Sequence, residues 1–136
     1  MLLVSACLAG VFCRYNGESK ELDWVKSLVD HGLAVTACPE QLGGLTTPRL
    51  PAELSGGSGE DVLRGTGRVV DSAGNDVTAQ FILGAKRTLA LARAAGCREA
   101  VLKARSPSCG FCPEKRGVAA ALLAAEGIKI RNEEEY

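Results

Sequence analysis

Three cysteines each follow an apolar run, and together they could bind a metal or an iron–sulfur cluster. Val4-Ser5-Ala6-Cys7 and Val35-Thr36-Ala37-Cys38 are nearly the same tetrapeptide, and each ends in a cysteine directly after apolar residues. Cys109 lies in a loop that follows a third apolar run, 100–103. In an open parallel sheet, ligands bind outside the carboxyl ends of the strands. If the three runs are strands of one such sheet, their thiols converge at one edge, where thiolates can hold a soft metal or a cluster.

The apolar runs alternate with segments of helical periodicity. Continuous apolar runs predict buried strands over 2–5, 34–37 and 99–103, and a last edge strand over 129–131. Apolar residues at helical spacing predict helices over 22–29, 79–95 and 118–126. Strands that alternate with helices imply a parallel sheet covered by helices on both faces. The predicted fold class is therefore α/β, with one domain over residues 1–136.

The remaining segments are predicted to be less regular. Residues 39–67 are rich in Gly and Pro, which predicts an irregular excursion loop that is flexible at its Gly-Ser stretch. Segments 68–70 and 76–77 flank a turn and predict a small hairpin. Thr78 is predicted to be the N-cap of the helix that follows. The acidic end of the chain, 132–136, is predicted to be a solvated tail.

Composition and charge argue against a protein that binds nucleic acid or membrane by charge alone. Of the 136 residues 46% are hydrophobic, and 16 Lys and Arg balance 16 Asp and Glu. This balance still allows a small polar ligand in a locally charged pocket. The apolar start lacks the basic region and cleavage site of a signal peptide and is too short to span a bilayer. We therefore expect a cytoplasmic protein, in which six cysteines favour metal binding or catalysis over disulfides.

The spacing of the cysteines does not decide which metal they bind. Three thiolates can hold a four-iron cluster at three corners and leave one iron open as a Lewis acid. A zinc site with three protein ligands is the alternative. Cys112 could be a fourth ligand, or could form a Cys-x-x-Cys redox dithiol with Cys109. Cys13 could shape the site or be a spare thiol, and burial of all these thiols as small apolar groups is the plainest alternative.

Polar residues near the same edge could carry out acid–base chemistry. Glu40 stands two residues after the second cysteine, and a carboxylate in a dry site can transfer protons near neutral pH. Ser106 and Ser108 flank a proline beside the third cysteine and could position a water or protonate a leaving group, although loop serines mostly form turns. Lys103 and Arg105 add positive charge there and could orient a carbonyl or a phosphate.

Several segments taken together resemble the thiouracil desulfidase family, which was long labelled only as a domain of unknown function. In chain order they are Val4-Ser5-Ala6-Cys7-Leu8-Ala9-Gly10, Cys13-Arg14-Tyr15-Asn16-Gly17, Cys38-Pro39-Glu40-Gln41-Leu42-Gly43-Gly44-Leu45, Thr47-Pro48-Arg49, Asp76-Val77-Thr78 and Ser106-Pro107-Ser108-Cys109-Gly110. Each motif alone is weak. The ordered set is specific, and it runs over nearly the whole chain.

The resemblance implies a Rossmann-like three-layer domain with a mainly parallel sheet of about four to five strands. It implies a 4Fe-4S cluster held by Cys7, Cys38 and Cys109, with Glu40 and Ser106 in catalytic positions. The implied reaction is a non-redox desulfidation at the open iron, which converts a thiolated pyrimidine to uracil and hydrosulfide. Further candidate site residues are Cys13, Cys112, Ser108, Lys103 and Arg49.

The sequence leaves the substrate and two other functions open. The substrate could be 2-thiouracil, 4-thiouracil or a nucleoside, and thiolated RNA is not excluded. A non-catalytic iron–sulfur or metal-binding module is one alternative function, and a thiol redox protein that uses Cys109 and Cys112 is the other. The chain departs from the family in segment 111–116, which is shorter than the usual Gly-rich segment before the last helix. That segment is expected to wall the pocket, so the size of the substrate is left open.

Overall fold

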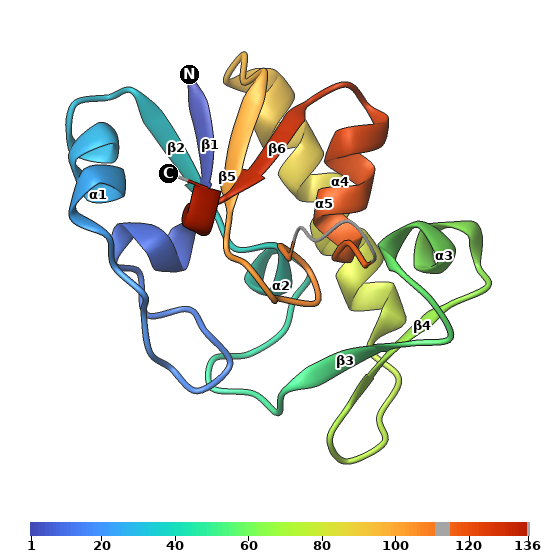
Figure 1. Cartoon of the computed structure of the whole chain (residues 1–136). Coiled ribbons are helices and arrows are strands. Elements are labelled where there is room, and N and C mark those ends of the chain that lie inside the picture. Colours follow the sequence, from blue (N-terminus) through green and yellow to red (C-terminus); the bar gives the residue numbers. More distant parts are fainter. Residues whose placement is uncertain (111–114, 136) are drawn as a thin grey trace.

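In the part of the chain that the computed structural model describes, residues 1–110 and 115–135, four short strands form one parallel sheet (Figure 1). In sheet order they are β2 (Ala34–Ala37), β1 (Leu2–Ser5), β5 (Glu99–Leu102) and β6 (Lys129–Asn132). Leu3 lies opposite Val35 of one neighbouring strand and Ala100 of the other. Central strands of such a sheet are buried on both faces, so their sequences are continuous apolar runs. The strand bounds predicted from those runs are correct to within one residue.

Helices cover both faces of this sheet. One face is covered by α1 (Asp23–Asp30) and the short helix η1 (Ala6–Ala9), and the other by α2 (Pro39–Leu42), α4 (Thr78–Ala94) and α5 (Val118–Ala125). Successive strand residues point to opposite faces. Leu3 therefore packs in the core beneath α4 and α5, whereas Val4 packs against Val25 of α1. This three-layer α/β arrangement confirms the predicted Rossmann-like fold.

The chain changes direction across the sheet at β1. From β1 it passes through α1 to β2 on one side, and it later returns through α4 to β5 on the other side. The carboxyl ends of β1 and β5 thus meet at a topological switch point, which is where open α/β sheets bind ligands. Cys7 follows β1, Cys38 follows β2, and the loop with Cys109 follows β5. All three predicted thiols are therefore carried to this edge.

The predicted irregular loop at 39–67 is more regular than its composition indicates. It contains α2, β3 (Ala52–Ser55) and α3 (Gly59–Arg64). Ser58 and Asp61 form a capping box that starts α3 directly after the Gly-Ser stretch. The predicted small hairpin is present, because Val70 pairs antiparallel with Asp76 and the backbone N–H of Val77 donates to the carbonyl oxygen of Val69. The sequence did not predict that β4 (Arg68–Asp71) also pairs antiparallel with β3.

Thr78 is the first residue of α4, and Val77 occupies the N-cap position, so the predicted cap is wrong by one residue. The hydroxyl of Thr78 accepts a hydrogen bond from the backbone N–H of Val69 over 2.9 Å. Further along α4, Gly84 lies against the carbonyl oxygen of Pro39, where a Cβ atom would collide. The absence of a side chain at Gly84 allows α2 to pack closely on α4.

The acidic C-terminal segment is only in part the solvated tail that its charge predicts, because Glu134 and Glu135 are exposed whereas Glu133 is not. A short helix, η2 (Glu133–Glu135), follows β6. The Glu133 side chain is only 12% exposed and contacts the loop after β5. Among the described residues, no helix is long and apolar enough to cross a membrane.

Candidate functional site

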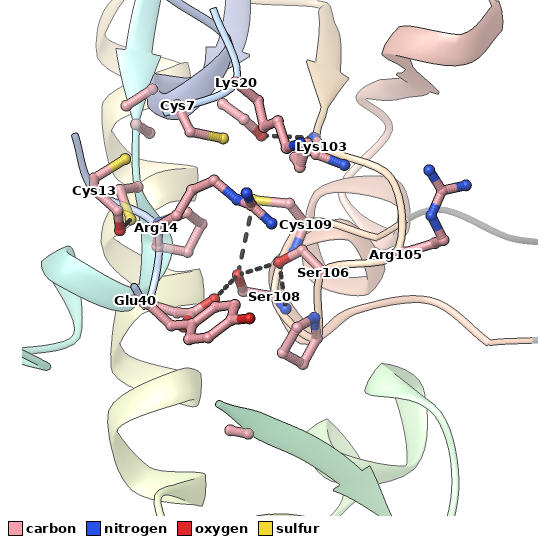
Figure 2. Close-up of a pocket in the computed structure, with 18 of the residues that line it drawn as sticks. Cys7, Cys13, Arg14, Lys20, Glu40, Lys103, Arg105, Ser106, Ser108 and Cys109 are labelled. Carbon is pink, nitrogen blue, oxygen red and sulfur yellow. Dashed lines mark hydrogen bonds between the residues drawn. The ribbon is translucent and has the colours of Figure 1, made fainter. Parts of the chain in front are cut away.

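A cavity of about 400 Å³ opens at the carboxyl edge of the sheet (Figure 2). Segments that are far apart in the sequence form its wall, because the ends of β1, β2 and β5 meet there. Its lining residues are 5–7, 13–15, 20, 37–40, 49, 51–52 and 103–109. Every predicted site residue outside segment 111–114 lies on this wall. Cys112 falls in that segment, outside the described residues, so its predicted role as a fourth ligand or redox thiol stays a prediction.

Four free thiols lie on the cavity wall. Cys7, Cys13 and Cys109 are buried, and Cys38 is half-buried. Cys7 lies on η1 directly after β1, and Cys38 is the N-cap residue of α2. Among the described residues, no group of three or more His, Cys, Asp or Glu side chains is arranged around a single metal ion. The four thiols are instead distributed around the cavity.

Cys13 lies between Cys7 and Cys38 and changes the acidity of both thiols. Its thiol is within hydrogen-bonding reach of each, and hydrogen bonds to the two neighbouring sulfurs raise the pKa of Cys13 well above its usual range. The hydrogen bond from Cys13 lowers the pKa of Cys7, and the same interaction lowers the pKa of Cys38 to about 6. Because a thiol carries a single hydrogen, Cys13 can donate to either neighbouring sulfur, one at a time, and so favours the thiolate form of the sulfur that it contacts.

The pKa of the Cys109 thiol is shifted in the opposite direction. Burial raises the pKa of its thiol to about 12, because no solvent stabilises the charged form. The Ser108 hydroxyl lies 3.8 Å from the Cys109 sulfur. Cys109 therefore stays protonated near neutral pH in the protein alone, and it must lose its proton if it binds a metal.

Glu40 and Arg49 form an ion pair on the cavity wall. The Arg49 Nε atom donates to Glu40 Oε1 over 2.9 Å, and the Arg49 and Glu40 side chains are 8% and 13% exposed. Arg49 also donates to the carbonyl oxygen of Cys13 over 2.9 Å. Glu40 is carried by the first turn of α2, directly after Cys38. Arg49 therefore ties the carboxylate to the turn that carries Cys13.

Two serine hydroxyls connect Glu40 to the cavity. Ser108 Oγ donates to Glu40 Oε2 over 2.9 Å and lies 3.1 Å from Ser106 Oγ. Ser106 Oγ also accepts the backbone N–H groups of Cys109 at 3.1 Å and Ser108 at 3.3 Å. Because an ionised carboxylate only accepts hydrogen bonds, Ser108 is the donor to Glu40 and accepts from Ser106. The three side chains therefore form a continuous chain of hydrogen bonds from Ser106 to Glu40.

A sequence model described as 2-thiouracil desulfurase matches residues 2–135. The chain belongs to this family. The uncharacterized protein YbbK of Bacillus subtilis (strain 168) is 47% identical over 146 residues, which covers 99% of this chain and 97% of YbbK. A solved structure of the 4Fe-4S-dependent thiouracil desulfidase TudS matches with a TM-score of 0.85 at 39% identity, over 98% of this chain and 91% of that chain. The family resemblance read from the motifs is confirmed.

In this member of the desulfurase family, both basic residues of the 103–109 wall form ion pairs. Lys103 pairs with Glu133 at 3.3 Å, and Arg105 pairs with Glu134 at 2.9 Å. That they could orient a carbonyl or a phosphate stays a prediction, and in the structure each has a carboxylate partner from the acidic C-terminal segment. Arg14 and Lys20 also line the cavity.

Sequence reasoning missed three charged or aromatic wall residues of this desulfurase-family site. Arg14 and Tyr15 follow Cys13 in one of the motifs, so their place beside a predicted site thiol was a usable signal. No motif or neighbouring site residue in the sequence indicated that Lys20 lines the cavity. Arg14 lies over the ring of Tyr15, with its guanidinium carbon 6.0 Å from the ring centre. The Arg14 charge lies close enough to Cys7 to contribute to the lowered pKa of that thiol.

Proposed function

We propose that this protein removes sulfur from a thiolated pyrimidine, such as 2-thiouracil, 4-thiouracil or their nucleosides, to give uracil or uridine and hydrosulfide. The observation that carries this proposal is one cavity that combines soft thiol ligands with a buried carboxylate–serine path. Family membership and the likeness to TudS support the same chemistry. The 4Fe-4S dependence named for TudS supports an iron–sulfur cluster as the cofactor.

The donor set on the cavity wall fits such a cluster. We assign Cys7, Cys38 and Cys109 as its three ligands. Each ligand of a four-iron cluster binds a different iron, so thiols placed around a cavity suit it better than thiols aimed at one point. The lowered pKa values of Cys7 and Cys38 favour the thiolate forms that ligation needs. When bound, the cluster would supply an open iron as a Lewis acid for the thiocarbonyl sulfur.

Glu40, Ser108 and Ser106 would move the proton of the attacking water. Ser106 lies at the cavity end of the path, and a water beside it would lose a proton to Ser106 as the hydroxyl hydrogens pass through Ser108 to Glu40. The backbone N–H groups of Ser108 and Cys109 stabilise the negative charge that develops on Ser106 Oγ during this transfer. Arg49 holds the other carboxylate oxygen, so Glu40 keeps one oxygen directed at Ser108.

The reaction balances without electron transfer. The pyrimidine carbon loses its double bond to sulfur and forms one to the oxygen of water. Both water hydrogens leave with the sulfur as hydrogen sulfide or as hydrosulfide and a proton. Glu40 returns its proton along the same path to the leaving sulfur. The enzyme therefore needs water and the thiolated base, and no reductant.

The first test is the metal content of protein purified without oxygen. We expect a brown protein with about four irons and four sulfides per chain, as a thiolate-bound cluster site holds. The same sample should convert 2- or 4-thiouracil to uracil and release one sulfide per turnover. A colourless protein that cannot be reconstituted, or one that carries zinc, would overturn the proposal. That result would favour a metal-binding module or a thiol redox protein.

Glu40→Gln tests the proton path separately. The variant should keep its iron and lose turnover, because the amide cannot accept the proton. Glu53→Gln is the matched control, because Glu53 is an exposed carboxylate on β3 that is not itself a lining residue of the cavity. Full activity in Glu40→Gln would remove Glu40 from the mechanism while leaving the cluster assignment standing.

A further inference from the structure

The C-terminal segment holds the loop that carries the serines and the third thiol. This loop, residues 103–110, follows β5 and contains Ser106, Ser108 and Cys109. Glu133 and Glu134, which follow β6, contact the start of the loop through their carboxylates. We call these two residues the C-terminal clamp. They lie nearly thirty positions away from the loop, so sequence proximity does not explain the contact.

Glu133 makes the buried half of the clamp. Its Oε1 atom accepts the backbone N–H of Ala104 over 2.6 Å, and its Oε2 atom lies 3.3 Å from the Lys103 ammonium group. Ala104 is 5% exposed, so its N–H has little access to water. A buried N–H without a partner is costly, and a hydrogen bond to a charged acceptor is stronger than one to a neutral acceptor. Glu133 therefore fixes the first turn of the loop.

Glu134 makes the outer half of the clamp. Its two carboxylate oxygens each accept a hydrogen bond from the Arg105 guanidinium, both over 2.9 Å. Arg105 has a φ of +63°, and no other residue besides glycine has positive φ in the described part of the chain. Such a backbone conformation is disfavoured for residues with a Cβ atom and persists only where surrounding contacts impose it. The paired carboxylate is such a contact.

The conformation at Arg105 sets the position of the catalytic serines. Ser106 follows directly, and its hydroxyl accepts the N–H groups of Ser108 and Cys109. A change at 104–105 would therefore move Ser106, and with it the hydrogen bond from Ser108 to Glu40. Displacing a reacting group by about 1 Å can reduce a rate by about a hundredfold.

We propose that Glu133, assisted by Glu134, is a positioning residue that holds the 103–110 loop in the geometry needed for desulfidation. The expected effect of the clamp on catalysis rests on the proposed function. The ordering of the loop by the clamp does not depend on whether the protein turns over thiouracil.

The test compares Glu133→Ala, Glu133→Gln and Glu134→Gln with wild-type protein purified without oxygen. Glu133→Gln keeps an acceptor for the Ala104 N–H and removes only the charge. Glu126→Gln is the matched control, because Glu126 pairs with Arg93 at 2.7 Å on an exposed surface away from the cavity. The readouts are kcat and KM with 4-thiouracil, iron content, melting temperature and hydrogen exchange of peptides covering 103–110.

We expect Glu133→Ala to lower kcat by about tenfold or more while KM changes by less than about twofold, because positioning acts on the reacting groups. Loop amides should exchange faster in Glu133→Ala than in wild type, with Glu133→Gln between them and Glu126→Gln unchanged. If Glu133→Ala does not fold, the same measurements on Glu133→Gln and Glu134→Gln decide the outcome.

Unchanged loop exchange would overturn the clamp, and so would a lower melting temperature with unchanged kcat. If wild-type protein, with its cluster, shows no desulfidation, the proposed function fails. Faster loop exchange in Glu133→Ala would then still support the clamp, and unchanged exchange would reject it.

Discussion

Ser108 donates its hydroxyl hydrogen to Glu40 over 2.9 Å, although the two residues are 68 positions apart in the sequence. Ser108 is 2% exposed, and among the described residues the hydroxyl of Ser106, 3.1 Å away, is the donor that its oxygen can accept from. The buried hydroxyl therefore has a fixed direction, with its hydrogen toward the carboxylate. A path of this kind depends on the middle residue as much as on either end.

Replacing Ser108 by Ala should stop proton transfer between Ser106 and Glu40. We expect kcat to fall by about 10²- to 10⁴-fold, the range that general acid–base groups contribute, with little change in KM. Sulfide release from 4-thiouracil measures the effect, and iron analysis checks that the cluster is retained. Ser72→Ala, at an exposed turn position, is the control. Wild-type activity in Ser108→Ala would mean that water reaches Glu40 directly.

The ion pair between Arg49 and Glu40 should contribute to stability as well as to orientation. Removing one partner of a buried pair leaves an uncompensated charge, so we expect Arg49→Ala to lower the free energy of unfolding by about 3–5 kcal/mol. Urea unfolding of Arg49→Ala, Glu40→Gln and the double variant measures the coupling between the two residues. The double variant should be less destabilised than the sum of the single changes. Additive effects would show that the side chains act independently.

The sequence predicts the strands and the convergence of the thiols because both follow from local patterns. Continuous apolar runs mark buried strands, and the carboxyl ends of parallel strands share one edge, which brings Cys7, Cys38 and Cys109 together. Whether these thiols bind a cluster is still a prediction. The place of Arg14 could have been inferred from its position beside Cys13.

Other features depend on contacts that no local pattern contains. The acidic residues at the end of the chain predict a solvated segment. The Glu133 side chain is nevertheless shielded from solvent, because β6 lies beside β5 and places Glu133 against the loop that follows β5. Segment 39–67 reads as irregular because glycines and prolines separate its short elements. Its strand β3 is stabilised by pairing with β4, which is a tertiary contact.

The thiols of protein prepared without a cluster should differ widely in reactivity. The thiolate is the nucleophile, and the pKa of Cys38 is lowered to about 6 by the hydrogen bond from Cys13. Alkylation of Cys38 by iodoacetamide should therefore rise as the pH passes 6 and level off near neutral pH. Cys109, with its pKa raised to about 12 by burial, should stay unmodified over the same range.

Cys13→Ala tests the cause of that difference. Loss of the Cys13 hydrogen bond raises the pKa of Cys38, so the alkylation profile should shift to higher pH. Cys97→Ala is the control, because Cys97 is a core thiol away from the cavity. Peptide mass spectrometry across a pH series identifies each modified residue. An unchanged Cys38 profile in Cys13→Ala would show that Cys13 is not the donor.

Gly84→Ala should be destabilising although alanine is the better helix former. A Cβ atom at Gly84 would collide with the carbonyl oxygen of Pro39, which is backbone and cannot rotate away. We expect the clash to exceed the gain in helix propensity of about 1 kcal/mol and to leave a net loss of about 1–3 kcal/mol. The same clash pushes α2 away from α4 and moves Glu40, so kcat should fall together with the melting temperature. Leu83→Ala, at an exposed position of α4, is the control, and a Gly84→Ala protein as stable as wild type would show that α2 can shift without cost.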